Sequence, residues 1–359
     1  MFRRIFYFDQ AGLILNVKAV RPELVTLIAS CFLLFGFNVT LWLHLFAITA
    51  ADWEGIAMRV AFGVMVLCIF NIVLTFLAFK RVLKPVLIFL FLVSSSVAYF
   101  MSQYGVMIDT GMLRNFAETN ATEVRDLLSV KMAVYIVLLG IVPSLILWKT
   151  TINYRRWHHD LISKALVTVA CTGLIGVVAM ANYQGLSSLF RNHHELRLMV
   201  VPSNYIGASV GYLREQVVSA QRPFVKIGED AKRSTGWDLH TRKSLTVLVV
   251  GESARAENFG ILGYNRDTTP QLQKEKGVIA FSDVHSCGTE TAVSVPCMFS
   301  NMARKDYSAS KAKNQEGVLD VLKHAGLNVV WRDNQSGCKG TCDRVTVQDR
   351  KSTRLNSSH

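Results

Sequence analysis

The sequence has few charged residues and, in its first half, very few acidic ones. Asp, Glu, Lys and Arg make up 18% of the 359 residues, whereas 51% are hydrophobic. Acidic residues are scarcest before about residue 185, and the remainder has an ordinary globular composition. This excludes a simple soluble enzyme and predicts a membrane part followed by a water-soluble part. The net charge of +13 does not indicate a nucleic-acid partner, because basic residues are also expected beside membrane spans.

Five apolar runs are long enough to cross a bilayer as helices, which takes about 20 residues. They are residues 24–49, 56–79, 82–101, 132–148 and 161–182. Lys and Arg cluster before the first run, between the second and third, and between the fourth and fifth. The positive-inside rule therefore predicts a cytoplasmic N-terminus, with everything after about residue 182 outside. The first run is too long for a cleaved signal peptide.

Two polar stretches follow or interrupt the spans. In the loop 103–130, Asn115, Thr119 and Glu123 recur every four residues, as on one face of a helix. The residues alone favour a structural reading for Glu123, because Asn120 and Glu123 fit a capping box. The amphipathic stretch 185–221 suits the membrane surface.

His193 and His194 lie in that amphipathic stretch. Adjacent side chains point about 100° apart on a helix and do not easily hold one ion, so both are interpreted as solvated interfacial histidines. The polar segment 222–243 then reads as a linker.

The soluble part has the pattern of an α/β domain with a parallel sheet. The apolar run 245–250 predicts a buried central strand, 277–284 and 327–331 predict further strands, and 314–324 predicts a helix. Chemistry in such sheets collects beyond the carboxyl ends of the strands. Glu252 and the segments 286–291 and 333–339 would meet there.

Four cysteines fall in the part predicted to lie outside, where disulfides persist. Their short separations suggest Cys287 with Cys297 and Cys338 with Cys342, although four cysteines allow three connectivities. A zinc ribbon is the competing interpretation, but neither pair has CxxC spacing. Three further cysteines lie inside spans and read as small buried apolar residues: Cys31, Cys68 and Cys171.

The predicted rim offers a carboxylate, Glu252, together with the hydroxyls of Ser253, Thr289 and Thr291 and the cation of Lys339. A Ser-His-Asp hydrolase is poorly supported, because GES is not a G-x-S-x-G elbow. A carboxylate near a threonine suits a divalent metal, which lowers the pKa of a bound hydroxyl. The alternative is that the threonines only cap local structure.

Four long motifs carry a resemblance. They are VVGESARAENFGILGY at 249–264, TTPQL at 268–272, SCGTETAVSVPCMFS at 286–300 and NQEGVLDVLKHAGLNVVWRDNQSGCKG at 314–340. From its first residue to about 348, the chain resembles the lipid A phosphoethanolamine transferases, which include the mobile colistin-resistance enzymes. The resemblance implies five spans, a bridging region and an alkaline-phosphatase-like or sulfatase-like periplasmic domain, anchored in the bacterial inner membrane.

The resemblance also implies roles for particular residues. Glu252 matches a zinc ligand, and Thr291 matches the nucleophile that also contacts the zinc. The resemblance further implies that both cysteine pairs are disulfides, and it outweighs the structural reading of Glu123. Residues that match contacts to the phosphoethanolamine substrate are Asn115, Thr119, Glu123, Ser336 and Lys339.

The implied reaction moves phosphoethanolamine from phosphatidylethanolamine to a lipid A phosphate, which weakens the attraction of polymyxins. The cofactor would be Zn²⁺, and a monomer is favoured. Two alternatives remain: a phosphoglycerol transferase or sulfatase-like hydrolase, and a non-enzymatic transporter or scaffold. Transport has little support, because Asn38, His44 and Asn71 are the main polar residues of the spans and no charged pathway crosses them.

One departure from the family concerns the end of the chain. The Asp-His pair that completes the family's zinc site is not in the sequence, and the possible codons of residues 349–359 read like a sequencing adapter. Without that tail the charge is about +11, since it holds three basic residues and one acidic residue. We therefore expect a truncated, inactive fragment. Its predicted divisions are 1–184 membrane domain, 185–243 bridging region, 244–348 start of the catalytic domain and 349–359 non-native tail.

Overall fold

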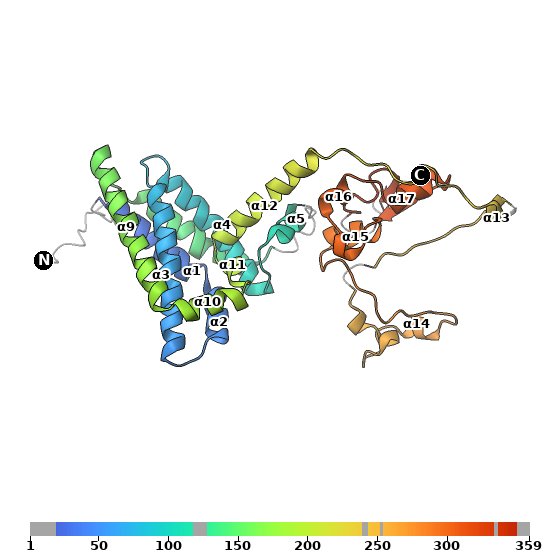
Figure 1. Cartoon of the computed structure of the whole chain (residues 1–359), viewed down its shortest axis with the longest axis horizontal. Helices are drawn as coiled ribbons and strands as arrows, with labels where there is room; N and C mark the ends of the chain where they lie inside the picture. The colour runs from blue at the N-terminus through green and yellow to red at the C-terminus, as the bar shows by residue number, and fades with distance from the viewer. Residues whose placement is uncertain (1–18, 118–127, 239–242, 252–253, 334–336, 350–359) are drawn as a thin grey trace. The chain divides into compact units, whose positions relative to one another are not determined.

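The computed structural model describes residues 19–117, 128–238, 243–251, 254–333 and 337–349. The chain forms two compact units (Figure 1). The first contains Met1–Leu113 and Ala121–Gly211, and the second contains Arg114–Asn120 and Tyr212–His359. The boundary at Gly211 lies inside the stretch 185–243 that was expected to bridge the two parts.

The first unit is helical, as predicted. Among the described residues, four helical segments are long and apolar enough to cross a membrane, and a fifth joins them if the bent pair α1 and α2 counts as one span. Its elements are α1 (Pro22–Gly36), α2 (Val39–Ile48), α3 (Trp53–Phe76), α4 (Leu83–Tyr104), α7 (Val130–Tyr135), the π-helix η1 (Ile136–Ile141), α8 (Val142–Lys149), α9 (Trp157–Ala181), α10 (Tyr183–Asn192) and α11 (Leu196–Met199). Two more helices, α5 (Thr110–Ala117) and α12 (Ser203–Ala220), cross the boundary between the units.

The first apolar run is not one straight helix, contrary to the prediction for 24–49. It bends by 61° between α1 and α2. At the bend the Asn38 side chain donates to Leu33 O and to Val201 O, both at 2.8 Å, and accepts from Val201 N at 2.8 Å. The Asn38 amide therefore takes over a carbonyl at the end of α1 and fastens the bend to a loop far along the chain. We call this bend the elbow.

The fourth span is continuous but changes its winding at η1. Val142 N–H donates to Val137 O, one residue further back than in an α-helix. Pro143 follows and has no N–H to donate, which favours such a change. Gly140 lies where this span meets α4, because a Cβ there would stand 2.8 Å from Ser95 Oγ.

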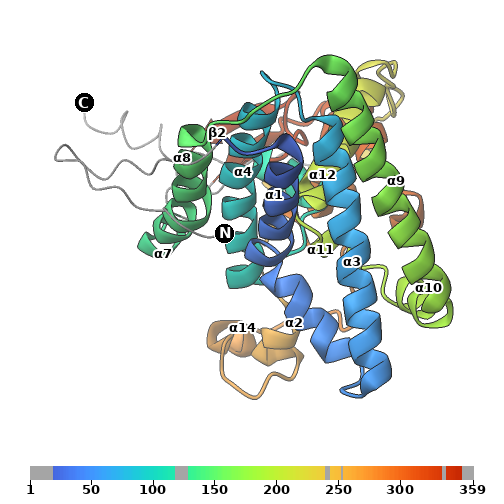
Figure 2. The same cartoon turned by 90° about the vertical axis from the view of Figure 1, so that its left-hand side faces the viewer.

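The helices of the first unit lie side by side around one core (Figure 2), and many of their other apolar side chains are exposed. Helix α3 packs against α1 and α9, and α4 packs against η1 and α8. Leu33, Leu41 and Leu87 are completely or almost completely buried. By contrast, Val169 and Val177 on α9 are 70% and 66% exposed. Large apolar side chains on the outside of well-packed helices suit a lipid solvent.

The second unit has short helices and one small parallel sheet. Strand β1 (Val330–Asp333) pairs with β2 (Thr346–Asp349), from Val330 opposite Thr346 to Asp333 opposite Asp349. Val295, Phe299 and Leu319 form its core with the Cys338–Cys342 disulfide. Its helices are α13 (Thr235–Asp238), η2 (Ala256–Asn258), η3 (Gly260–Leu262), α14 (Pro270–Lys274), α15 (Thr291–Met298), η4 (Arg304–Asp306), α16 (Ala309–Lys313) and α17 (Val318–His324).

Two of the three predicted strands are wrong. Residues 245–250 and 277–284 form no strand, and all of their side chains except the partly buried Val250 are exposed, with Leu245 at 89% and Ile279 at 77%. A buried strand needs hydrogen-bonded neighbours, and the sheet has two strands within the described residues. The strand predicted at 327–331 overlaps β1, which begins at Val330. The helix predicted at 314–324 begins later, at Val318.

The elbow makes a stability prediction. Replacing Asn38, which is 1% exposed, by Ala removes three hydrogen bonds and leaves buried backbone groups of Leu33 and Val201 without those partners. We expect a loss of about 1–3 kcal/mol, measured as a lower thermal midpoint in detergent micelles. The control is Asn192→Ala, because Asn192 is exposed and bonds only Ser188 among the described residues. Equal midpoints for the two variants would contradict this role of Asn38.

Candidate functional site

Thr291 is the first residue of α15. The preceding Glu290 is extended, and its carbonyl accepts from Val293 N at 3.0 Å and Ser294 N at 2.8 Å, which starts the helix. A disulfide between Cys287 and Cys297 ties the approach loop to the body of α15. Thr291 thus sits at the positive end of the helix dipole, where negative charge is stabilised.

Lys339 lies in a short loop closed by the Cys338–Cys342 disulfide. It is the one non-glycine residue with positive φ in the described part of the chain, at 52°, between Gly337 at 88° and Gly340 at 86°. A side chain in this left-handed region costs about 1 kcal/mol relative to glycine. Observed strain of this kind points to a functional position.

A cavity of about 420 Å³ lies within the second unit. Ala292, the neighbour of Thr291 on α15, and Lys339 both line it, together with Arg114, Lys313 and Arg344. Arg114 is ion-paired with Glu215, which also lines the cavity. The structure therefore brings the start of α15 and the strained lysine to one cavity that basic and acidic side chains line together.

A buried polar cluster supports one wall of this cavity. Arg344 donates to Asp320 from Nε at 2.8 Å and from Nη2 at 2.7 Å, and Asp320 also accepts from Gly317 N. Burial alone would raise the pKa of Asp320, but the hydrogen bonds from Arg344 and Gly317 outweigh it and the pKa is lowered. Glu316 behaves in the same way. Burial alone would raise its pKa, but hydrogen bonds from His324 and from Ile227 N outweigh this effect and the pKa is lowered.

The sequence reasoning missed this cluster, although a signal was present. Glu316, Asp320 and His324 follow one another at intervals of four residues, which places them on one face of a helical turn. Their partner Arg344 lies 24 residues after Asp320, so the pairing itself needs the fold.

The predicted site residues are only partly within the described part of the chain. Lys339 lines the cavity, Thr291 precedes the lining residue Ala292 on α15, and Asn115 is on α5 in the second unit. The structure has the disulfides Cys287–Cys297 and Cys338–Cys342, the pairs that the resemblance implied. The remaining predictions fall outside the described residues: Thr119, Glu123, Glu252, Ser253 and Ser336.

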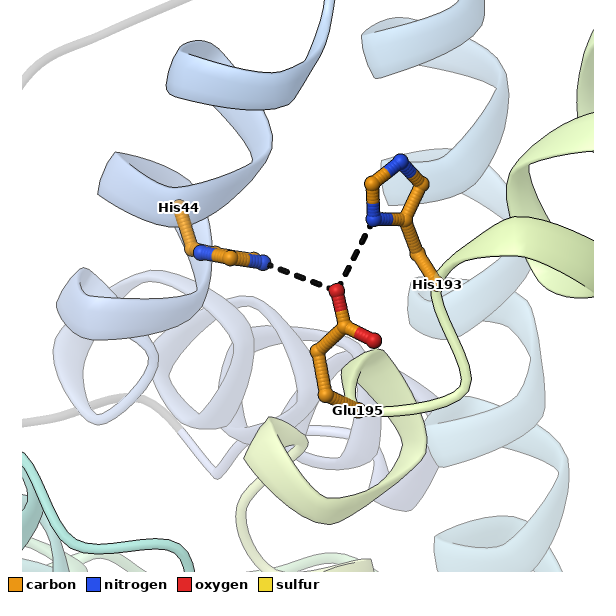
Figure 3. Close-up of side chains that lie close together, drawn as sticks. All are labelled: His44, His193 and Glu195. Carbon is orange, nitrogen blue, oxygen red and sulfur yellow. Dashed lines mark hydrogen bonds and ion pairs between the residues drawn. The ribbon is translucent and has the colours of Figure 1, made fainter.

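The structure adds an acidic partner to the interpretation of His193 as a solvated histidine. In the first unit, His193 Nδ1 lies 2.8 Å from Glu195 Oε1, and His44 Nε2 lies 3.3 Å from the same oxygen (Figure 3). A hydrogen bond from its own backbone, and then those with His193 and His44, lower the pKa of Glu195 to about 2. His194 is exposed, in agreement with the prediction for that residue.

Comparison with known proteins agrees with this architecture. Residues 66–217 match the family described as "Phosphoethanolamine transferase EptA/EptB", and residues 244–358 match the sulfatase family. The integral membrane lipooligosaccharide phosphoethanolamine transferase EptA from Neisseria meningitidis superposes with a TM-score of 0.83 at 31% identity, covering 95% of this chain and 63% of that one. The class is thus a helical membrane domain followed by part of a sulfatase-like domain.

Two relatives from Escherichia coli specify the family. Phosphoethanolamine transferase EptA of strain K12 is 42% identical over 288 residues, which are 80% of this chain and 52% of the relative. Phosphatidylethanolamine transferase Mcr-1 is 39% identical over 301 residues, 82% and 54% of the two chains. The chain belongs to the EptA/Mcr family of lipid A phosphoethanolamine transferases, as the motifs predicted. It spans about half the length of the curated relatives it matches.

The Asp320–Arg344 pair makes stability depend on pH. Because the folded pKa of Asp320 lies below the unfolded value, its contribution is present above about pH 4 and is lost as the pH falls through the folded pKa. At neutral pH we expect Asp320→Asn to cost roughly 2–3 kcal/mol by pulse proteolysis in urea. The difference in unfolding free energy between Asp320→Asn and the unsubstituted chain should become smaller at acid pH.

The control is Glu229→Gln. Its pair with Lys226 is about 60% exposed on both sides, so the change should stay below about 0.5 kcal/mol. If Asp320→Asn lowers the unfolding free energy by the same amount from neutral to acid pH, the ionic role of Asp320 is contradicted.

Strain at Lys339 predicts different effects for two substitutions. Lys339→Ala keeps a Cβ in the left-handed region, whereas Lys339→Gly removes it. We expect the glycine variant to be more stable than the alanine variant by about 1 kcal/mol, by the same proteolysis measurement. At Lys323, on α17 with ordinary helical geometry, the order should reverse. An alanine variant at position 339 that is as stable as the glycine variant would show that no strain is stored there.

Proposed function

We propose that the whole protein to which this chain corresponds transfers phosphoethanolamine from phosphatidylethanolamine to a lipid A phosphate, with Thr291 as nucleophile. The observation that carries the proposal is the convergence of the α15 N-terminus and Lys339 on one cavity of about 420 Å³. It is supported by the family of the chain and by the transferase activity for which its relatives are named.

The reaction proceeds in two transfers. In the first, Thr291 Oγ bonds to the phosphorus, the bond to the diacylglycerol oxygen breaks, and the hydroxyl proton ends on the departing diacylglycerol. In the second, an oxygen of a lipid A phosphate attacks the same phosphorus, the bond to Thr291 Oγ breaks, and a proton of the lipid A phosphate monoester passes to Oγ and restores the hydroxyl. The helix dipole of α15 favours the negative charge that develops on the phosphoryl oxygens.

Lys339 supplies a positive charge to the phosphate in this proposal. Asn115, Thr119, Glu123 and Ser336 are proposed to contact the same headgroup, as the family resemblance implies. The membrane part anchors the enzyme in the inner membrane with the second unit on the periplasmic side, where both lipid substrates are reached. Masking a lipid A phosphate lowers surface negative charge and thereby the binding of cationic polymyxins.

Zinc dependence belongs to the same proposal. Bound zinc lowers the pKa of a hydroxyl that it coordinates. Glu252 and Thr291 would supply two oxygen donors, whereas catalytic zinc sites use about three protein ligands. Around Thr291, the described residues bring no group of three His, Cys, Asp or Glu side chains together. The residues present therefore do not complete a zinc site, and no step is derived through the ion.

The chain of 359 residues is proposed to be inactive by itself. Most of the apolar run 245–250 that precedes Glu252 is exposed in this structure, with no strand beside it among the described residues. A catalytic group needs to be held within about 0.5 Å of its productive position.

Intact mass spectrometry tests the nucleophile. A longer chain that carries the rest of the sulfatase-like domain, incubated with phosphatidylethanolamine, should gain one phosphoethanolamine. Thr291→Ala should abolish this gain, while Thr289→Ala, two residues away, should retain it. The 359-residue chain, measured alongside, should gain nothing. An adduct that persists in Thr291→Ala would exclude Thr291 as the carrier.

A second measurement separates the proposal from its alternatives. A phosphoglycerol transferase or sulfatase-like hydrolase would leave lipid A without added phosphoethanolamine, as would a transporter or scaffold. Lipid A extracted from cells that express the longer chain should carry the added group. Its absence, with the protein folded in the membrane, would favour one of the alternatives.

A further inference from the structure

Three potential ligand side chains from two distant segments converge in the first unit. His44 is on α2, and His193 and Glu195 lie in the connection from α10 to α11 (Figure 3). Both imidazoles face the same carboxylate oxygen, at 3.3 Å from His44 Nε2 and 2.8 Å from His193 Nδ1. The three ligand atoms all lie within 4.8 Å of one another.

These separations suit coordination. Zinc binds imidazole nitrogen at about 2.0–2.1 Å and carboxylate oxygen at about 2.0–2.2 Å, so two donors on one tetrahedral ion stand roughly 3.3 Å apart. The observed nitrogen-to-oxygen distances are close to this value already. Small side-chain shifts would therefore admit an ion between the three groups.

The backbone on both sides of the cluster is anchored. Leu41 and Leu45, which flank His44 on α2, are fully buried, and Leu196, next to Glu195, is 1% exposed. Helix α11 packs against α2, and the elbow hydrogen bonds from Asn38 to Val201 join the same two segments. The ligand positions are thus fixed before any ion binds, which lowers the entropy lost on binding.

The cluster is also open to the solvent. The side chains of His44, His193 and Glu195 are 32%, 30% and 31% exposed. An ion can enter, and water can complete its coordination, as in sites with three protein ligands and an open position.

We propose that His44, His193 and Glu195 form a binding site for a divalent transition-metal ion, with zinc as the reference ion. Two imidazoles and one carboxylate select Zn²⁺, Co²⁺ or Ni²⁺ over Mg²⁺ and Ca²⁺, which prefer oxygen ligands. The site lies in the first unit, whereas Glu252 and Thr291 belong to the second. The bound ion joins α2 to the α10–α11 connection, beside the elbow.

The test uses the 359-residue chain in detergent, purified without a polyhistidine tag and stripped of metal by a chelator. All variants carry Glu252→Gln, so that the catalytic-domain carboxylate does not contribute. Titration with Co²⁺, followed by visible absorption, and with Zn²⁺, followed by calorimetry, should show one tight equivalent. His44→Ala and His193→Ala should weaken binding about tenfold or more, since even outer contacts to a metal site contribute that much.

The matched control is His194→Ala, which removes the exposed neighbour of His193 and should bind as the parent does. Glu195→Gln keeps an oxygen near both imidazoles but removes the negative ligand, so it should fold normally and also bind weakly. Zn²⁺ should raise the thermal midpoint of the parent but not of Glu195→Gln, and Mg²⁺ should raise neither. Equal Zn²⁺ affinity in the parent and Glu195→Gln, or no tight equivalent in the parent, would overturn the proposal.

Discussion

Backbone hydrogen bonding is the constraint on which both units depend. A helix satisfies its N–H and C=O groups within one segment, whereas a strand depends on other segments. The apolar runs of the first unit therefore form helices that pack into one core, with Leu33 and Leu87 in its interior. In the second unit the apolar run 245–250 has no strand beside it among the described residues, and residues 245–249 stay exposed. Apolar runs are thus packed into a core in the first unit, whereas the run 245–250 in the second unit is largely exposed.

This difference explains what the sequence could predict. Helical spans depend on local composition, so the second, third and fifth were predicted nearly as α3, α4 and α9 occur. The elbow was missed, because Asn38 acts through Val201, 163 residues away. Strands 245–250 and 277–284 were predicted from composition alone, while β1 forms because β2 lies beside it in parallel register.

The candidate site divides in the same way. Thr291 and Lys339 were found through long motifs, and the cavity that they approach belongs to the fold. The Asp320–Arg344 pair and the cluster of His44, His193 and Glu195 were missed, because each joins residues that are remote in sequence. An adjacent pair such as His193 and His194 drew attention for its spacing, yet the real partners of His193 are Glu195 and, through it, His44.

The elbow also decides how the first apolar run matches the bilayer. A straight helix over 24–49 would be about 39 Å long, well beyond a hydrocarbon core of about 30 Å. With the 61° bend, α1 contributes about 22 Å and α2 adds only about 7 Å along the α1 axis, together roughly 30 Å. The bend thus removes the hydrophobic mismatch without tilting α1, and a thinner bilayer favours a sharper bend. The same bend therefore sets the position of His44, in the middle of α2.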